Sequence, residues 1–397
     1  MVVETAIDSR VAALRAQLPA VLTTGYFNTG SNGPIPTVAY DAADRVARRE
    51  LEQGRIVPGV YESNRDRNRE VAALAARIFN AGPDEIALTH STSEGLSTAL
   101  MGLTWQAGDE VVTTIEEHPG LLNPLAFLAW RHKVITRYAR IGDGGGDVVA
   151  AIEEKITSRT RVIAISHVLW STGAVLPLRD IVDLARENEL FVFVDGAQSA
   201  GQVPVDLHAM GIDVYAMAGQ KWLCGLEATG LLYVRRERFP DIAPTFVRYG
   251  QFDTSGYFIP AAGAQRYEIG EFYSPAIAAQ EAALTWLQEE VGLDWAYARI
   301  ADLGAEFRRL LSVIAGVSVV TPTEPMAGLV NFNVDGVRPH DVANRVQQRG
   351  YTIRHVETKP CTSSARVAVG WWNTGDEVAG LAAAIADLAD ESRAGRG

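Results

Sequence analysis

Residues 191–226 read FVFVDGAQSAGQVPVDLHAMGIDVYAMAGQKWLCGL, and the rest of the chain can be interpreted outward from them. Residues 191–194 form an unbroken apolar run of aromatic and β-branched side chains, which is typical of a strand buried on both faces of a parallel sheet. Asp195 follows where such a strand ends, and Lys221 follows a second apolar run, residues 213–217, in the same way. Because ligands of open α/β sheets bind at the carboxyl ends of the strands, we expect both side chains at a ligand site.

An acid and a lysine at two strand ends have two interpretations. They can form a structural ion pair or remain separate surface charges. They also fit pyridoxal phosphate (PLP), a cofactor that needs a lysine for its Schiff base and a carboxylate to keep its ring nitrogen protonated. Apolar neighbours would disfavour the ammonium form of Lys221 and make its amine nucleophilic, while a pyridinium would keep Asp195 ionised. We therefore expect PLP as the cofactor, with Lys221 and Asp195 as catalytic residues.

The sequence resembles the class V aminotransferase family in two motifs, VDGAQSAG around Asp195 and AGQKW around Lys221. The resemblance extends over nearly the whole chain, from residues 26–28 to residues 371–374. The family consists of fold-type I PLP enzymes, among them cysteine desulfurases, cyst(e)ine C–S lyases and isopenicillin N epimerase. Within the family, the overall pattern is most similar to that of the C–S lyases and other desulfurase-like proteins.

The resemblance implies an α/β fold of the fold-type I PLP-dependent transferase architecture, in which a large domain with a mainly parallel seven-stranded sheet precedes a smaller C-terminal α/β domain. We expect an N-terminal segment over residues 1–23 that packs with the small domain, a large PLP-binding domain over residues 24–275, and a small domain over residues 276–397. A chain of 397 residues exceeds the size at which one core stops growing, which agrees with two domains.

Composition and charge limit the partners that we expect. The chain is 47% hydrophobic and 21% charged, as in ordinary soluble proteins, and its formal net charge is −12. No basic surplus exists to neutralise phosphates, so neither nucleic acid nor an anionic membrane is expected as a partner. Two cysteines, Cys224 and Cys361, give neither a disulfide framework nor a metal site. Without a recognisable signal peptide or a membrane-spanning run, the sequence predicts a cytoplasmic protein.

Further cofactor contacts are implied by the resemblance. His118 ends a predicted strand in the motif EEHPG, where the family's histidine stacks on the pyridine ring and aids proton transfer. Thr92 and Ser93 lie in a hydroxyl-rich turn that opens a helix, where free N–H groups and the helix dipole suit a phosphate. An ordinary N-cap would have the same sequence. Gln198 matches the family residue that hydrogen-bonds the phenolic oxygen of the cofactor or the Schiff base.

The chain departs from the family pattern around the expected phosphate. Relatives have Ser or Thr, Gly and His before the lysine, whereas this chain has Ala218, Gly219 and Gln220. Gln220 can still donate a hydrogen bond, and we retain it as a cofactor-binding residue. Glu271 replaces a threonine that normally reaches the phosphate of the neighbouring subunit, and a carboxylate there would repel a phosphate dianion. Either Glu271 points away or the phosphate site is rebuilt.

Four residues are candidates for substrate binding. Arg366 lies in a pattern that resembles the family's CRASxxxYNT, in which the arginine makes a bidentate salt bridge to the substrate α-carboxylate. Arg354 resembles a second carboxylate-facing arginine of the C–S lyases. Trp170, in SHVLWSTG, should line the pocket at a strand end, although core packing is an alternative. Asn32 lies in a turn-rich loop that approaches the substrate side.

Residues 55–68 are polar and are predicted to form an irregular segment, which is either an active-site flap or plain surface.

The residues favour β-elimination from a sulfur-containing amino acid, cystine or an S-substituted cysteine. The main alternative is a desulfurase that uses Cys361 as its thiolate, but only eleven residues separate Arg354 from Arg366, which leaves little loop to carry a thiol inward. An aminotransferase or an epimerase of the isopenicillin N epimerase kind is a third possibility, and a non-catalytic PLP-binding protein is a fourth. The resemblance also implies a homodimer with shared active sites.

Overall fold

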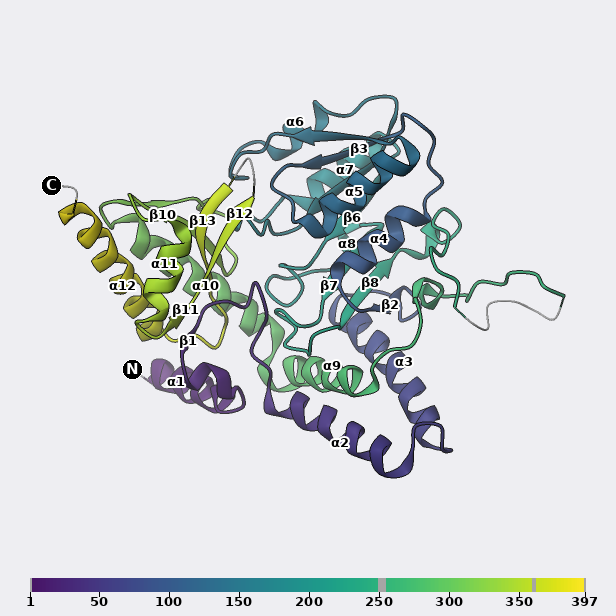
Figure 1. Cartoon of the computed structure of the whole chain (residues 1–397), viewed down its shortest axis with the longest axis horizontal. Helices are drawn as coiled ribbons and strands as arrows, with labels where there is room; N and C mark the ends of the chain where they lie inside the picture. Colours follow the sequence, from purple (N-terminus) through teal and green to yellow (C-terminus); the bar gives the residue numbers. More distant parts are fainter. Residues whose placement is uncertain (1, 249–254, 359–361, 396–397) are drawn as a thin grey trace.

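The computed structural model describes residues 2–248, 255–358 and 362–395 (Figure 1). The α-helices are α1 (Val2–Arg15), α2 (Thr37–Gln53), α3 (Val60–Ile78), α4 (Thr92–Gly102), α5 (Pro119–His132), α6 (Val148–Glu153), α7 (Leu178–Glu187), α8 (Leu207–Met210), α9 (Ser274–Trp286), α10 (Leu293–Ser312), α11 (Pro339–Gln347) and α12 (Gly375–Ala394). The strands are β1 (Gly25–Tyr26), β2 (Ile86–Thr89), β3 (Glu110–Thr114), β4 (Ile135–Ala139), β5 (Thr160–Ser166), β6 (Phe191–Asp195), β7 (Val214–Ala218), β8 (Gly230–Val234), β9 (Val317–Val319), β10 (Leu329–Val334), β11 (Tyr351–Thr352), β12 (Arg354–Thr358) and β13 (Thr362–Ala368). Short turns of other helix types are η1 (Pro19–Leu22), η2 (Arg236–Arg238), η3 (Ala264–Tyr267) and η4 (Leu287–Val291).

The larger sheet has seven strands in the order β2-β8-β7-β6-β5-β3-β4. The strands from β7 to β4 are parallel to their neighbours, whereas β8 runs antiparallel to both β2 and β7. The expected mainly parallel seven-stranded sheet is therefore confirmed. The strand that begins at Phe191 lies at its centre, with β5 on one side and β7 on the other.

Successive residues of the central strand enter hydrophobic cores on opposite faces of this sheet. Phe193 packs in a core with apolar residues of α4 and α5, while Val192 and Val194 pack in a core with residues of α3 and α7. Helices thus cover both faces, which explains why β6 is apolar without alternation. A strand enclosed in this way presents its next polar residue, Asp195, only at its end.

A second, smaller sheet forms the core of the C-terminal part. Four antiparallel strands lie in the order β12-β13-β10-β9. Helices α10, α11 and α12 pack against them around buried residues such as Phe307, Phe332 and Ile385. Figure 1 shows this sheet and its helices as a body beside the larger sheet.

The N-terminal segment contacts the C-terminal part of the chain. The guanidinium of Arg15 donates to the backbone oxygen of Trp372 and forms an ion pair with Glu377 at 2.7 Å. Strand β1 then pairs in parallel with β11. These contacts agree with a segment over residues 1–23 that packs with the small domain, and the three domain boundaries stay a prediction.

The structure corrects the prediction for residues 55–68. From Val60 onward this segment belongs to α3, so it is irregular only before that residue. One face of α3 packs against α9, and Arg67 forms an ion pair with Glu281 at 3.1 Å. Of the polar residues that suggested a loop, Glu62, Arg65 and Asp66 are exposed on this helix, whereas others are partly buried. No helix in the described ranges is long and apolar enough to cross a membrane.

Candidate active site

The predicted catalytic residues meet at one edge of the larger sheet because parallel strands place their carboxyl ends together. Asp195 ends β6, Lys221 follows β7, His118 follows β3, and Trp170 follows β5. All four line a cavity of about 200 Å³. The lining side chains and backbone come from Gly30, Ser31, Ser91, Thr92, Ser93, His118, Trp170, Asp195, Ala197, Gln198, Ala218, Gln220, Lys221, Arg354 and Arg366.

Asp195 and Lys221 are both buried and interact electrostatically. Burial raises the pKa of the Asp195 carboxyl, and this is opposed by a hydrogen bond from the Ala197 N–H, 2.9 Å from Oδ1, and by the charge of Lys221. Burial lowers the pKa of Lys221 to about 8, because the ammonium loses its hydration, although Asp195 favours the charged form. An amine with this pKa is partly neutral near pH 7 to 8 and can act as a nucleophile or a base.

His118 is held as a neutral imidazole beside Trp170. Its Nδ1 accepts a hydrogen bond from the Gly120 N–H at 2.9 Å, and its ring meets the indole of Trp170 edge-on with centroids 4.7 Å apart. Burial, followed by the positive charges of Lys221 and Arg366, lowers the pKa of His118 to about 4. The imidazole is therefore available as an uncharged aromatic surface over the cavity.

The turn before α4 lines the same cavity with Ser91, Thr92 and Ser93. Ser91 is the N-cap, and its hydroxyl accepts from the Glu94 N–H at 3.1 Å. The buried hydroxyl of Thr92 has no partner among the described residues, and neither does the buried side-chain oxygen of Gln220. An unpartnered buried hydroxyl is costly, and the Thr92 hydroxyl at a helix N-terminus can donate to a bound anion such as the phosphate of PLP, whereas the Gln220 oxygen is an acceptor and could pair only with a donor. The residues present therefore fit the cofactor that the sequence predicts.

Gln198 connects the cavity to the loop that covers it. Its amide nitrogen donates to the backbone oxygen of Gly30 at 2.8 Å, and its amide oxygen accepts from the indole N–H of Trp222 at 3.1 Å. One amide N–H remains for a ligand. The structure thus adds a positioning role to the cofactor contact predicted for Gln198, which stays a prediction.

Two arginines from neighbouring strands also line the cavity. Arg354 on β12 and Arg366 on β13 are direct cross-strand partners. Arg366 is 1% exposed, and it donates to the backbone oxygen of Trp170 at 3.3 Å. Burial, and then the charge of Arg354, lowers the pKa of Arg366 to about 9. In the described part of the chain neither guanidinium has a carboxylate partner, which is the arrangement expected of a site that awaits an anion.

Ser31 joins the two arginines and was not predicted from the sequence. Its hydroxyl accepts from Arg354 at 3.0 Å and from Arg366 at 3.5 Å, and it donates to Asn28 at 2.8 Å. The neighbouring Asn32, which was predicted to bind substrate, does not line the cavity. Its amide donates instead to Glu227 at 2.9 Å, so its substrate role stays a prediction.

Glycines allow this loop to approach the site closely. A Cβ at Gly33 would lie 2.0 Å from the backbone oxygen of Lys221, and one at Gly30 would lie 2.8 Å from the guanidinium of Arg366. The Gly33 N–H also donates to the backbone oxygen of Gln220 at 2.8 Å. The loop is therefore fixed against both the lysine and the arginine.

The sequence profile of class V aminotransferases matches residues 53–381. The chain belongs to the class V aminotransferase family. A probable cysteine desulfurase of Mycobacterium leprae (strain TN) is 29% identical over 94% of this chain and 96% of its own length. A probable cysteine desulfurase of Methanothermobacter thermautotrophicus is 24% identical over 96% of this chain and 99% of its own length.

Solved structures of the class V family have the same fold. The cystine C–S lyase C-DES, in complex with its reaction product cysteine persulfide, is 29% identical with a TM-score of 0.89, over 94% of this chain and 99% of its own. A lysine-to-alanine variant of C-DES, with glycine covalently linked to its PLP cofactor, gives a TM-score of 0.88 at the same identity. A cysteine desulfurase of Thermococcus onnurineus NA1, at 23% identity and a TM-score of 0.86, agrees in fold. The family and the fold class predicted from the sequence are therefore confirmed.

Glu271, which departs from the class V pattern, lies away from the cavity of Lys221. It is exposed and lines a separate cavity of about 650 Å³ together with Arg55, Tyr61 and Arg65. Within this chain its carboxylate therefore does not face the turn at Thr92. The predicted conflict concerns the phosphate of a neighbouring subunit, so it stays a prediction.

Of the two cysteines, only Cys224 lies within the described residues. Cys224 is fully buried outside the cavity, and burial raises the pKa of its thiol to about 12, so it is unreactive. Cys361, the thiolate of the desulfurase alternative, lies outside the described residues. Among the residues that are described, no cluster of three His, Cys, Asp or Glu side chains is placed to hold a metal ion.

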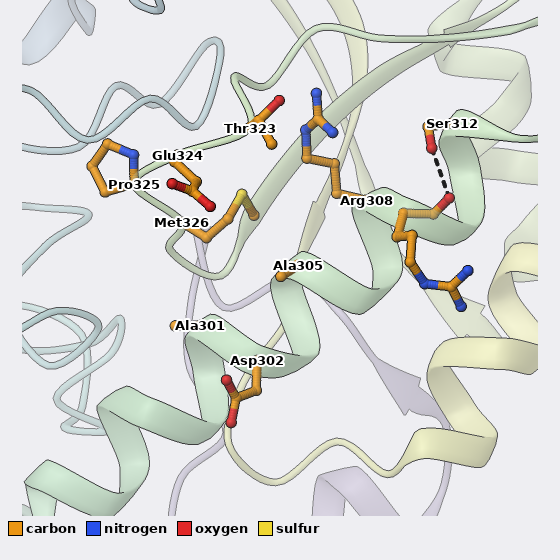
Figure 2. A pocket seen from close by; sticks show the side chains of 10 residues that line it. Ala301, Asp302, Ala305, Arg308, Ser312, Thr323, Glu324, Pro325 and Met326 are labelled. Carbon is orange, nitrogen blue, oxygen red and sulfur yellow. Dashed lines mark hydrogen bonds between the residues drawn. The ribbon is translucent and has the colours of Figure 1, made fainter.

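Another large cavity lies in the C-terminal part of the chain. It has about 690 Å³ and lies between α10 and residues 323–326 (Figure 2). Its two arginines already have partners, since Arg308 donates to the backbone oxygen of Thr321 and Arg309 pairs with Glu306. None of the predicted site residues lines it, so size alone does not mark the active site.

Proposed function

We propose that this protein is a PLP-dependent lyase that catalyses β-elimination from a sulfur-containing amino acid such as cystine or an S-substituted cysteine. Membership of the class V family, together with the PLP-bound C-DES, establishes the coarser statement that the chain is a PLP-dependent enzyme of the desulfurase and C–S lyase group. The single observation that carries the finer proposal is the pair of adjacent arginines, Arg354 and Arg366, which have no acidic partner among the residues that the structure describes.

The paired arginines match a substrate with two carboxylates. Arg366 is buried and close to Trp170, so its planar fork suits the α-carboxylate near the reacting carbon. Arg354 is exposed and lines the same cavity, so it would bind the distal carboxylate of a molecule such as cystine. The cystine lyase C-DES, a structural neighbour, acts on such a substrate.

When bound, PLP withdraws electrons from the substrate α-carbon. The chain's own residues would hold and orient the reactants around it. Lys221, with a pKa near 8, would bind the cofactor and take the α-proton, Asp195 would hold the ring nitrogen protonated, and the neutral ring of His118 would cover the cofactor face. Thr92, Ser93 and Gln220 would hold the phosphate, and Gln198 the phenolic oxygen.

For cystine the overall reaction balances with one water. Cystine and water give pyruvate, ammonia and cysteine persulfide, with cleavage of the bond between Cβ and sulfur. The test is incubation of the purified protein with cystine, cysteine and S-methylcysteine, with pyruvate, alanine, keto acid and inverted enantiomer all quantified. Pyruvate from at least one of these substrates is the expected result, and its absence with all of them would contradict the proposal.

A persulfide-forming desulfurase is the second candidate, because the curated relatives at 24–29% identity are named as desulfurases. That activity needs the thiolate of Cys361. The variant Cys361→Ala separates the two reactions: elimination keeps its rate in the variant, whereas desulfuration of cysteine to alanine is lost. The matched control is Cys224→Ala, which removes the buried thiol that does not line the cavity.

Other outcomes of the same experiment identify the remaining alternatives. A keto acid product would indicate an aminotransferase, and an inverted enantiomer would indicate an epimerase. A yellow protein that converts no amino acid would indicate a non-catalytic PLP-binding protein.

We also propose a homodimer in the cytoplasm. Large apolar side chains are exposed on α2, on the turn after it, on residues 246–247 and on residues 257–259: Leu51, Ile56, Phe246, Val247, Tyr257, Phe258 and Ile259. A second copy of the chain would cover such a surface. Light scattering with size-exclusion chromatography gives the mass, and a monomer at micromolar concentration would contradict the proposal.

A further inference from the structure

Glu117 is a fully buried carboxyl directly beside the proposed active site, and none of the roles described above uses it. It precedes His118 in the turn between β3 and α5. Its Oε2 accepts hydrogen bonds from the N–H of Ser166 at 3.0 Å and from the Ser166 hydroxyl, and its Oε1 is 3.1 Å from the hydroxyl of Thr114. Both oxygens therefore have partners, and all of those partners are uncharged.

The contact with Ser166 replaces a missing strand pairing. The register of β3 with β5 runs only to Val112 beside Ile163, so the later N–H of Ser166 has no backbone partner on the β3 side. On its other side Ser166 is the cross-strand partner of Asp195. Glu117 thus bridges the turn that carries His118 to the strand end that positions Asp195, the two residues expected to contact the cofactor ring.

The charges around Glu117 disfavour its ionisation. No arginine, lysine or histidine in the described ranges forms an ion pair with it, and the charged group that faces it is Asp195 on β6. From β5 and β3 it meets the N–H and the hydroxyl of Ser166 and the hydroxyl of Thr114, and the hydrogen bonds from Ser166 oppose the effect of burial on its pKa without cancelling it. Burial, with a further contribution from Asp195, raises the pKa of Glu117 to about 8. Lys221, by contrast, acts on Asp195 and favours its ionised form.

We propose that Glu117 is a positioning residue: a neutral carboxylic acid that fixes the His118 turn to the Asp195 strand end and leaves Asp195 as the one ionised carboxyl beneath the cofactor ring. In this state the proton is on Oε1 and is donated to the Thr114 hydroxyl, while Oε2 accepts from Ser166. This inference rests on the proposed function, because it assigns Asp195 to the ring nitrogen of PLP.

The neutral state has a measurable consequence. When Glu117 loses its proton at alkaline pH, a second negative charge appears next to Asp195. That charge stabilises protonated groups on the bound cofactor, so the visible absorption of the Lys221-bound cofactor should change through an extra step near the pKa of Glu117. A residue that only packs would produce no such step.

The test compares Glu117→Gln with Glu116→Gln in the PLP-loaded protein. Glutamine reproduces the neutral acid, because its oxygen can accept from Ser166 and its amide can donate to Thr114, but it cannot ionise. Glu116 is the adjacent buried carboxyl, and its side chain has no hydrogen bond to Ser166. Titration of the visible spectrum from pH 6 to 10 should show the extra step in the wild type and in Glu116→Gln, and its loss in Glu117→Gln. An unchanged titration in Glu117→Gln would overturn the proposal.

A second measurement uses the wild-type protein without PLP and is informative even if Glu117→Gln does not fold. Infrared difference spectra between pH 6 and pH 10 should contain the carbonyl stretch of a buried carboxylic acid that disappears at the higher pH. Absence of that band at pH 6 would also overturn the proposal. The two failures are distinguishable, since a protein that binds no PLP refutes the proposed function, whereas a PLP-bound protein without the step or the band refutes only the role of Glu117.

Discussion

Replacement of Arg366 by lysine tests the substrate site most directly. Arg366 is buried and presents a planar fork, whereas lysine would keep the positive charge but offer a single point contact. The variant therefore removes one of two charge-assisted hydrogen bonds to the α-carboxylate. A hydrogen bond of this kind contributes about 1.5–3 kcal/mol. At 1.36 kcal/mol per tenfold change, kcat/KM should fall roughly 10- to 150-fold.

The matched control is Arg354→Lys on the neighbouring strand. Arg354 is largely exposed, and interactions of exposed charges contribute about 0–1 kcal/mol, so kcat/KM should fall by less than about fivefold. Both variants should act mainly through KM, because the carboxylate contact is made in the ground state and in the transition state alike. The ratio between the two variants, rather than either value alone, tests the assignment.

The assay is the rate of pyruvate formation over a range of cystine concentrations, with thermal unfolding of each variant measured in parallel. Arg366 is buried without an acidic partner among the described residues, so its replacement should not lower the melting temperature. Equal losses in the two variants, or a loss in Arg354→Lys larger than in Arg366→Lys, would refute the assignment of the α-carboxylate to Arg366.

Three further predictions concern protonation and the covalent link to the cofactor. Lys221→Ala should abolish the borohydride-stable attachment of PLP, and attachment of PLP to another side chain would contradict the site. Capture of PLP by the unloaded protein should rise with pH to a plateau above about pH 8, because the neutral amine of Lys221 is the nucleophile. In Asp195→Asn this profile should move to lower pH, since the charge that favours the ammonium is removed, and an unmoved profile in stopped-flow absorbance would contradict the coupling. Burial lowers the pKa of His167 from 6.5 to about 4. As the pH drops, the histidine of the unfolded chain therefore binds a proton before that of the folded chain does. The free energy of unfolding should consequently fall between about pH 6.5 and about pH 4. His167→Gln should flatten this slope in urea titrations, whereas the same slope in the variant would assign it to other groups.

The sequence predicts the position of a site residue when that residue directly follows a buried strand. Asp195 and Lys221 each follow an apolar run, and a run buried on both faces can end only where the sheet ends. Local pattern therefore placed both side chains at the carboxyl edge, and the structure brings them to one cavity. The motifs of the class V family added His118, Trp170 and the arginines in the same way.

Residues whose role depends on a distant partner could not be predicted. Ser31 is one hydroxyl in a turn-rich loop, and only the register of β12 with β13 places two guanidinium groups beside it. Glu117 looks like any acid that follows a strand, and only the early end of the β3–β5 pairing gives it Ser166 as a partner. Residues 60–68 were misread because their helical face packs on α9, which is more than 200 residues away in the sequence.

The balance of charge in the cavity favours binding of anions in two places. Lys221, Arg354 and Arg366 supply positive charge, Asp195 supplies the negative charge facing Lys221, and burial disfavours the charged form of His118. Burial destabilises the charged forms of Lys221 and Arg366, and each is relieved when an anion enters. A phosphate at the α4 turn and a carboxylate at the arginines would each add negative charge to a cavity whose cationic groups are buried. Neutrality of Glu117 matters in this balance, because a second ionised carboxyl beneath the ring would offset the positive charge that draws both anions in.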